Sequence, residues 1–221
     1  LTIITPAALQ TEAERVAQLH REEGLTVAVI EQEKIFNEFS SGTPDASAYR
    51  RLMKMFYDRA EGNENVRPRY LLLFGDGSYN NRKSMEKLHS PECNMLLTYQ
   101  SKTSIDERES FVIEDYFGFL EDNSGEEIKV DKVCLGIGRF PISSIKNARL
   151  VVDKLYRYVH DKDFSSWKNN ICIAADDGDE AIHAEQADRG SDTLLLKNTS
   201  QPRLGFRVNK IYIDSYYMDP Q

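Results

Sequence analysis

The chain has 221 residues, a mass of 25.4 kDa and a formal net charge of −8, from 28 Lys and Arg against 36 Asp and Glu. This acidic balance excludes a general nucleic-acid binder, which needs a basic face, and it disfavours adhesion to anionic lipid. With 40% hydrophobic and 29% charged residues, the chain is expected to fold around a buried core and to contain one domain to one and a half.

The sequence shows no targeting or membrane-spanning segment. No apolar run approaches the roughly 20 residues of a membrane helix, and the longest strongly apolar stretch covers 70–74. The first residue is Leu1 rather than Met, and the chain opens directly in an apolar, strand-like stretch over 1–4. We therefore expect a piece of a longer protein, whose location this sequence does not report.

The cysteines are not expected to form a disulfide framework. An odd count, made up of Cys93, Cys134 and Cys172, excludes a fully paired set of disulfides. Cys134 and Cys172 lie in apolar, strand-like runs, where a free cysteine is expected to be a small buried hydrophobe. No Cys-x-x-Cys or His-x₃-His spacing occurs, so no structural zinc site is expected.

The predicted elements alternate between strands and helices. The first helix is expected to open with Thr5 as its hydroxyl cap and Pro6 in its first turn, and to end at Gly24. Periodicity and composition predict the other elements. The strands are expected over 1–4, 25–30, 70–74, 130–137, 171–175 and 208–213, and the further helices over 34–39, from Asp45 to Ala60, over 145–159 and over 179–196.

This alternation indicates an α/β fold with a mainly parallel sheet flanked by helices. The polar stretch over 160–170 interrupts the periodicity and is the best candidate for a boundary. The chain then restarts with a strand, a helix and a strand before Gln221. A second sheet is therefore expected to begin there and to remain unfinished.

Acidic turns follow two of the predicted strands. Gly75-Asp76-Gly77 comes after the strand over 70–74, and the run Asp-Asp-Gly-Asp over 176–179 comes after the strand over 171–175. Sites in open parallel sheets form beyond the carboxyl ends of strands, where such carboxylates could hold a metal ion, orient a histidine or meet a cationic substrate. The alternative is that Asp and Gly are simply good turn formers.

Two more positions are candidates of the same kind. Asp115 lies beside aromatic residues, although a loop anchored by Tyr116 and Phe117 explains it equally well. His183 follows the second acidic turn closely enough to approach it, but a lone histidine is more often structural. No Ser or Cys occupies a nucleophile turn of the Gly-x-Ser-x-Gly kind, and no phosphate-binding loop is present.

The order of the motifs carries more information than any one of them. Leu-Leu-Phe-Gly-Asp over 72–76 is followed by Glu-Asp-Tyr-Phe-Gly over 114–118 and by Gly-Ile-Gly-Arg-Phe-Pro over 136–141. Trp167 and Cys-Ile-Ala-Ala-Asp-Asp-Gly over 172–178 complete the set. In this order the motifs resemble the gingipain family of cysteine peptidases, and within it the branch that contains the sortase of the type IX secretion system of Bacteroidetes. The resemblance extends over nearly the whole chain.

The resemblance implies a caspase-like catalytic domain with two side-by-side α/β subdomains. Residues 1–165 would form the first, and residues 166–221 the truncated start of the second, catalytic one. In the family, the catalytic His follows a later strand in a His-Gly turn, and the nucleophilic Cys follows the strand after that. Neither motif occurs here, and Cys172 matches a structural cysteine. The chain is therefore expected to lack the Cys–His dyad and to be inactive alone.

The resemblance also implies roles for the acidic turn over 176–180. Asp177 matches the residue that orients the catalytic His, here supplied beyond residue 221, and a carboxylate bonded to imidazole fixes its tautomer. An Asp stands where the family's longer Glu is expected. Glu180, and less closely Asp179, matches the acid at the base of the substrate pocket in arginine-specific members, with His183 three residues beyond Glu180. We expect these three residues to bind substrate.

The expected function of the parent protein follows. It would be a cysteine endopeptidase or sortase that cleaves C-terminal sorting signals of secreted proteins, at the cell surface or outer membrane of a Gram-negative bacterium. Its partners would be those protein substrates, the remainder of the catalytic domain and other secretion-system proteins, with no nucleic acid. No cofactor and no metal site is expected, although a structural calcium ion is compatible with the resemblance.

Two functions of other classes remain open from the sequence. The missing dyad is compatible with a non-catalytic scaffold or interaction module of the secretion machinery. The acidic turns are compatible with a Mg²⁺-dependent phosphoryl-transfer domain. The latter needs a Lys or a Ser/Thr at a neighbouring strand end, and the sequence places none there.

Overall fold

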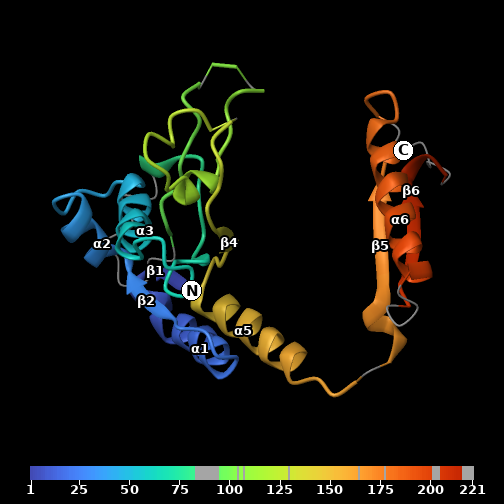
Figure 1. Cartoon of the computed structure of the whole chain (residues 1–221), viewed down its shortest axis with the longest axis horizontal. Helices are drawn as coiled ribbons and strands as arrows, with labels where there is room; N and C mark the ends of the chain where they lie inside the picture. Colours follow the sequence, from blue (N-terminus) through green and yellow to red (C-terminus); the bar gives the residue numbers. More distant parts are fainter. Residues whose placement is uncertain are drawn as a thin grey trace. The chain divides into compact units, whose positions relative to one another are not determined.

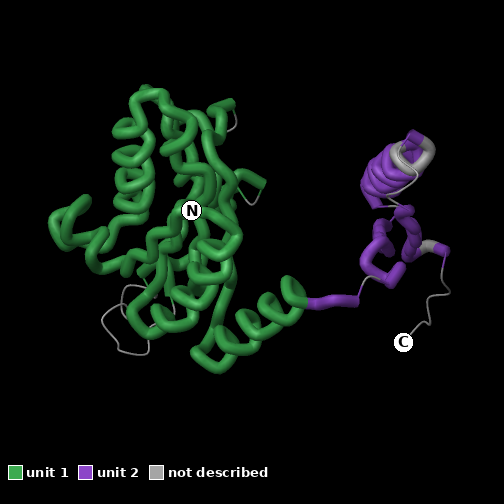
Figure 2. Tube along the Cα trace, turned by 60° about the horizontal axis from the view of Figure 1, so that its bottom comes forward, with its two compact units in different colours: residues 1–160 green, residues 161–221 purple. Residues whose placement is uncertain are grey.

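The structure is a computed structural model that describes residues 1–82, 95–103, 105–106, 108–128, 130–163, 165–176, 178–200 and 205–215. The chain forms two compact units, Leu1–His160 and Asp161–Gln221, which Figure 2 shows in different colours. Each unit has its own sheet. The polar stretch over 160–170, which the sequence offered as a boundary, begins where unit 1 ends at His160.

A four-stranded parallel sheet forms the centre of unit 1 (Figure 1). Its strands are β1 (Thr2–Thr5), β2 (Ala28–Glu31), β3 (Tyr70–Phe74) and β4 (Gly136–Phe140), in the order β2-β1-β3-β4. Every residue of β1 is buried, because β1 and β3 are the inner strands. The mainly parallel α/β class expected from the sequence is confirmed.

Helices and connecting segments cover the sheet on both faces. Helices α1 (Gln10–Glu22) and α5 (Ile145–Val159) share one apolar cluster, and α2 (Gln32–Phe39) and α3 (Ser47–Arg59) share the other. Strand side chains alternate between faces. Leu71 and Leu73 of β3 therefore join the α2–α3 cluster, while Phe74 joins the α1–α5 cluster.

Several boundaries agree closely with the sequence. Strand β3 and helix α5 occupy the predicted ranges, and Gly24 after α1 has a φ of +91°. The carboxylate of Asp45 accepts a hydrogen bond of 2.8 Å from the backbone N–H of Ser47, at the start of α3. Ser144 caps α5 by accepting a bond of 3.1 Å from Asn147 N. The capping residues and the glycine that ends a helix act locally in the sequence, and they have the same roles in the folded structure.

The expected start of the first helix was wrong. Thr5 belongs to β1 and is fully buried, and its hydroxyl donates to the carbonyl of Phe74 at 3.2 Å. That partner across the sheet takes the hydroxyl away from a capping role. Pro6 instead precedes a short 3₁₀ turn, η1 (Ala7–Leu9), and α1 begins only at Gln10.

Two strands lie later in the chain than expected. Strand β4 covers Gly136–Phe140 rather than 130–137, and β2 begins at Ala28 rather than at residue 25. Val130 is 80% exposed, so its β-branched side chain is not packed as it would be in a strand of the sheet. The segment before β4 is instead fastened to a distant loop, where Cys134 N donates to Gly118 O at 2.8 Å.

Unit 2 contains a two-stranded parallel sheet and one long helix. Its elements are η3 (Ser166–Asn169), β5 (Asn170–Ala175), α6 (Ile182–Ser200), β6 (Arg207–Tyr212) and η4 (Ile213–Ser215). Among the described residues, every buried hydrophobic side chain belongs to unit 1, and Ser191 is the one buried residue of unit 2. The second sheet is therefore present but lacks a core of its own within the described part of the chain.

Cys134 and Cys172 were expected to be buried, and for both this expectation was wrong. Cys172 lies in β5 as expected, but it is exposed, because the residues of β5 are alternately exposed and only half-buried. Cys134 is half-buried and lies outside the strands, with Sγ near the Glu121 carboxylate at 4.0 Å. Cys93 lies outside the described residues.

None of the helices in the described ranges is long and apolar enough to span a bilayer.

Unit 2 opens with a small hydrogen-bonded turn around Asp163. Its carboxylate accepts bonds from Ser165 N at 2.8 Å and from the indole N–H of Trp167 at 2.7 Å. Hydrogen bonds from Ser165, and then from Trp167, stabilise the ionised form and lower the pKa of Asp163 to about 2. A lowered pKa means that these bonds are present above the ordinary Asp pKa and are lost as the pH falls towards about 2.

The bond between Asp163 and Trp167 predicts an unusual titration. Trp167 is the single tryptophan of the chain, so its indole N–H gives one resonance in a ¹⁵N-correlated NMR spectrum. We expect that resonance to stay constant from pH 6 to 3 and to move only near pH 2, because Asp163 keeps its charge until then. Asp163→Asn should remove this titration. A midpoint near pH 4, which is ordinary for Asp, would contradict the bond.

Candidate functional site

The acidic turn of unit 2 connects the carboxyl end of β5 to α6. Strand β5 ends at Ala175, and Asp176 follows it as an exposed residue. Asp177, the residue expected to orient a catalytic histidine, lies outside the described residues. Asp179 and Glu180 form the exposed turn that leads into α6 at Ile182. The turn thus lies at the end of a parallel strand, where α/β proteins place their sites.

The backbone of this turn is strained. Asp179, Glu180 and Ala181 have φ values of 54°, 61° and 62°, in the left-handed region. For a residue with a Cβ, this conformation costs roughly 1–2 kcal/mol, and three such residues in succession are unusual. Strain of this kind persists where the surrounding structure imposes it, and it gathers at functional sites. The turn is therefore a stronger candidate site than its acidic composition alone indicates.

Two of the three expected substrate-binding residues, Asp179 and His183, lie near each other where the turn leads into α6. His183 Nε2 lies 3.7 Å from Asp179 Oδ2, one helical turn apart, with side chains 55% and 84% exposed. This is too long for a good hydrogen bond, and the attraction exists only when His183 is protonated. Glu180 is exposed and has no hydrogen bond or ion pair among the described residues. As described, the turn offers acceptors to a cationic group and holds no nucleophile.

The strain in the turn predicts opposite effects of two similar substitutions. Ala181→Gly removes the Cβ that opposes a positive φ, and we expect it to stabilise the start of α6 by about 1 kcal/mol. Ala184→Gly, inside α6, should destabilise the same helix by about 1 kcal/mol through lost helix propensity. Hydrogen exchange of the α6 amides measures both effects. Equal losses of protection in the two variants would show that the turn carries no strain.

A second cluster lies at the carboxyl ends of β3 and β4 in unit 1. Arg139, in β4, donates from Nε to Glu114 Oε1 at 2.6 Å and from Nη2 to Oε2 at 3.2 Å. Its Nη1 also donates to the carbonyls of Gly75 and Asp76, and its Nη2 to Leu97 O at 3.1 Å. One guanidinium therefore ties three loop segments to the end of the sheet, with a bidentate geometry that only arginine provides.

Sequence reasoning did not single out either member of this pair. Both residues lie in motifs that carried the resemblance. The signal that could have indicated Arg139 is its position as the one charged residue in the strand-like run Gly-Ile-Gly-Arg-Phe. Asp76, which was singled out, is half-buried, and its Oδ1 accepts a bond of 2.9 Å from Gly77 N. Because the Arg139 donors are already engaged with protein acceptors, the cluster is suited to holding loops rather than to binding an anion.

Asp115 is exposed at the start of η2 (Asp115–Gly118), whereas Tyr116 and Phe117 are buried. The Tyr116 ring stacks on Tyr99 with centroids 3.5 Å apart, and its hydroxyl donates to Ser47 Oγ at 3.1 Å. The aromatic anchors thus explain this loop, as the simpler interpretation of the sequence expected.

Within the described ranges, no group of three or more His, Cys, Asp or Glu residues could hold a metal ion.

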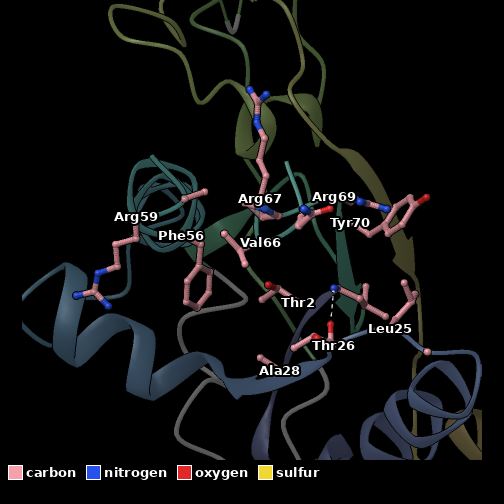
Figure 3. A pocket seen from close by; sticks show the side chains of 15 residues that line it. Thr2, Leu25, Thr26, Ala28, Phe56, Arg59, Val66, Arg67, Arg69 and Tyr70 are labelled. Atoms are coloured by element: carbon pink, nitrogen blue, oxygen red, sulfur yellow. Dashed lines mark hydrogen bonds between the residues drawn. The ribbon is translucent and has the colours of Figure 1, made fainter. Parts of the chain in front are cut away.

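A cavity of about 500 Å³ lies in unit 1 at the amino ends of β1, β2 and β3, at the opposite end of the strands from the Arg139 cluster (Figure 3). Arg59, Arg67 and Arg69 are among its lining residues, and no acidic residue is. Figure 3 shows the Arg59 and Arg67 side chains extending away from each other rather than converging. Arg67 also pairs with Glu64 at 2.8 Å. The cavity therefore lacks the convergent groups of a binding site.

The ion pair between Arg139 and Glu114 is expected to contribute to the unfolding free energy of unit 1. Glu114→Ala would leave the Arg139 side chain, only 11% exposed, without its carboxylate. We expect unit 1 to lose about 2 kcal/mol of unfolding free energy, less than a fully buried pair because carbonyl acceptors remain. Glu64→Ala, which removes a 74% exposed carboxylate from Arg67, is the matched control and should leave stability unchanged. Urea denaturation compares them, and equal midpoints would contradict the role of Arg139.

Comparison with known proteins defines the class to which this fold belongs. The parallel sheet of unit 1, with helices on both of its faces, is a caspase-like α/β arrangement. The model of Peptidase family C25 matches residues 1–221. The chain therefore belongs to Peptidase family C25, the gingipain family of cysteine peptidases.

Among solved structures, the chain is similar to dimeric latent PorU from Porphyromonas gingivalis, with 43% sequence identity and a TM-score of 0.61. The match covers 71% of this chain and 15% of that PorU chain. The chain thus spans a small part of the length of this relative. A search of the curated proteins found no match. The family expected from the order of the motifs is confirmed.

Proposed function

We propose that this chain is the N-terminal part of the catalytic region of a gingipain-like cysteine endopeptidase or sortase. The observation that carries the proposal is the match of the C25 family model to residues 1–221, together with 43% identity to PorU. In this proposal residues 1–165 form the first subdomain and residues 166–221 begin the second. The parent protein cleaves C-terminal sorting signals of secreted proteins at the surface of a Gram-negative bacterium, within the secretion machinery.

The chemistry is that of a thiolate and an imidazole supplied beyond residue 221. The thiolate attacks the scissile peptide carbonyl and forms an acyl-enzyme, and the imidazolium donates its proton to the departing amine. Water or an acceptor amine then attacks the thioester and releases the thiolate. Asp177 would hold the imidazole in the required tautomer.

The acidic turn would also bind substrate. Asp179 and Glu180 offer carboxylates in an exposed, strained turn, where a cationic side chain of the substrate could be neutralised. His183, 3.7 Å from Asp179, would modulate that charge when protonated. A pre-set backbone lowers the cost of ordering the turn around a substrate. This supports the assignment of these three residues to substrate binding.

The 221-residue chain is proposed to be inactive alone. Of the two described cysteines, Cys134 lies near Glu121 and Cys172 is exposed in β5, and neither has a hydrogen bond to a described histidine. The same observation favours a second candidate, a non-catalytic scaffold module of the secretion machinery. The two candidates differ in whether a reactive thiol exists in the parent protein.

A thiol-directed acyloxymethyl ketone peptide tests the proposal on the natural protein that contains this chain. We expect one adduct by intact mass, on a cysteine beyond Gln221, and none on the 221-residue chain. Asp177→Asn should slow labelling on the order of 10²-fold or more and change its pH profile, because the imidazole loses its orienting carboxylate. Asp176→Asn is the matched control at the neighbouring position. A folded parent protein without any adduct would support the scaffold instead.

A further inference from the structure

Helix α6 rests on the sheet of unit 2 through small side chains. It packs on both strands, β5 and β6 (Figure 1). The least exposed of its described residues recur at spacings of three and four, so they share one face of the helix. They are Ala184, Ala187, Ser191 and Leu194. Two alanines and a serine bury little apolar surface, and no described hydrophobic side chain of unit 2 is buried. Apolar packing by itself therefore holds α6 weakly.

Asp188 adds a polar tie between α6 and β6. Its Oδ1 accepts hydrogen bonds from Lys210 Nζ at 2.7 Å and from the Tyr212 hydroxyl at 2.5 Å. Lys210 and Tyr212 are two residues apart in β6, so they project from the same face of the sheet. The bonds from Lys210 and then from Tyr212 stabilise the ionised carboxylate and lower the pKa of Asp188. One charged acceptor thus joins the helix to two positions of the strand.

This tie lies across the acidic turn that connects β5 to α6. Tyr212 is the register partner of Ala175, the residue at which β5 ends and the turn begins. At the other end of the turn, the carbonyl of Ala181 accepts from Glu185 N at 3.0 Å, which joins the turn to the start of α6. Asp188 lies three residues beyond Glu185 in the same helix. The ladder at Ala175 and the bonds of Asp188 therefore fix both ends of the turn.

The residues of the turn do not by themselves explain its backbone. Asp179, Glu180 and Ala181 lie in the left-handed region, although each has a Cβ that opposes this conformation. Gly178, the one glycine of the turn, lies outside that region. A conformation that the residues disfavour persists where the surrounding structure imposes it. Two fixed ends are a constraint of this kind.

We propose that Asp188 is a positioning residue of the acidic turn. Together with Lys210 and Tyr212 it forms a clamp, called the Asp188 clamp, that holds residues 179–181 in the left-handed conformation. The clamp thereby fixes the directions in which the carboxylates of Asp179 and Glu180 leave the backbone. The importance of these directions for substrate binding rests on the proposed function, whereas the clamp is a property of unit 2 and is tested without peptidase activity.

An ordinary surface ion pair would not have this effect. Arg189 and Glu185 form such a pair in α6, with 3.8 Å between Nη2 and Oε2 and with both side chains largely exposed. Both partners belong to the same helix, so the pair ties α6 to nothing else, and pairs of this kind contribute little. The two donors to Asp188 come from another element instead. Breaking these bonds therefore releases α6 from β6.

NMR of the 221-residue chain tests the Asp188 clamp directly. Three-bond couplings and backbone chemical shifts report the φ of residues 179–181 in the folded state, so lower stability alone does not change them. We expect Asp188→Ala to abolish the left-handed signature of these residues, and Tyr212→Phe, which removes one hydroxyl, to weaken it. Asp192→Ala is the matched control, because Asp192 belongs to the same helix and acts on Lys210 through its charge. It should leave the signature unchanged.

A double substitution connects the clamp to the strain. We expect Ala181→Gly to raise the hydrogen-exchange protection of the α6 amides about fivefold, because glycine removes the Cβ that opposes a positive φ. In Asp188→Ala the same change should raise protection less than about twofold, since the released turn has no strain left to remove. A residue that only stabilises α6 would leave the effect of Ala181→Gly the same in both backgrounds.

Two results would overturn the proposal. They are an unchanged left-handed signature in folded Asp188→Ala and Tyr212→Phe, and an equal gain from Ala181→Gly with and without Asp188. Circular dichroism shows whether each variant retains α6. If Asp188→Ala loses the helix, the signature in Tyr212→Phe decides the question. The thiol label reports a cysteine beyond Gln221, whereas these measurements report the turn, so failure of the proposed function and failure of the Asp188 clamp are distinguishable.

Discussion

The requirement that a parallel sheet be covered on both faces governs this structure. In unit 1 the α1–α5 cluster covers one face and the α2–α3 cluster the other, and the inner strands β1 and β3 have largely buried side chains. Where cover is missing, over Gly136 and Gly138 of β4, the structure has a cavity and an open edge. In unit 2, the described strands bury no hydrophobic side chain at all. The same rule thus explains the stable core of unit 1 and the incomplete second sheet.

The two candidate clusters use charge in different ways. Arg139 is nearly buried, and its donors are satisfied by Glu114 and by backbone carbonyls, so it fixes the loops at the carboxyl end of the first sheet. Asp179 and His183 are exposed and only loosely in contact, and the backbone of Asp179 and of the two residues after it is held in the left-handed region. A satisfied charge stabilises a structure, whereas an exposed and unsatisfied one is available to a ligand. This contrast is why the turn after β5, rather than the Arg139 cluster, is the better candidate for recognition.

Membership of Peptidase family C25 and the local geometry give different kinds of information. The family relationship places the chain in a family of cysteine peptidases, yet the matched PorU structure is much longer than this chain, which covers 15% of it. The geometry of the described residues identifies neither a nucleophile nor a base. It shows instead how a strained acidic turn and an anchored set of loops are held at strand ends. The proposed function rests on the first kind of information.

The sequence by itself determined the α/β class, the range of β3 and α5, and the family, because periodicity, capping residues and motif order are local properties of the chain. It misplaced β4 and the start of α1, and it treated Cys172 as buried. Those features depend on partners distant in sequence. Thr5 bonds to Phe74, the segment at Cys134 is fastened to Gly118, and Cys172 lies on an uncovered sheet. Only the tertiary structure decided them, and only it brought Arg139 to Glu114, because burial and hydrogen bonding between remote segments have no local signature.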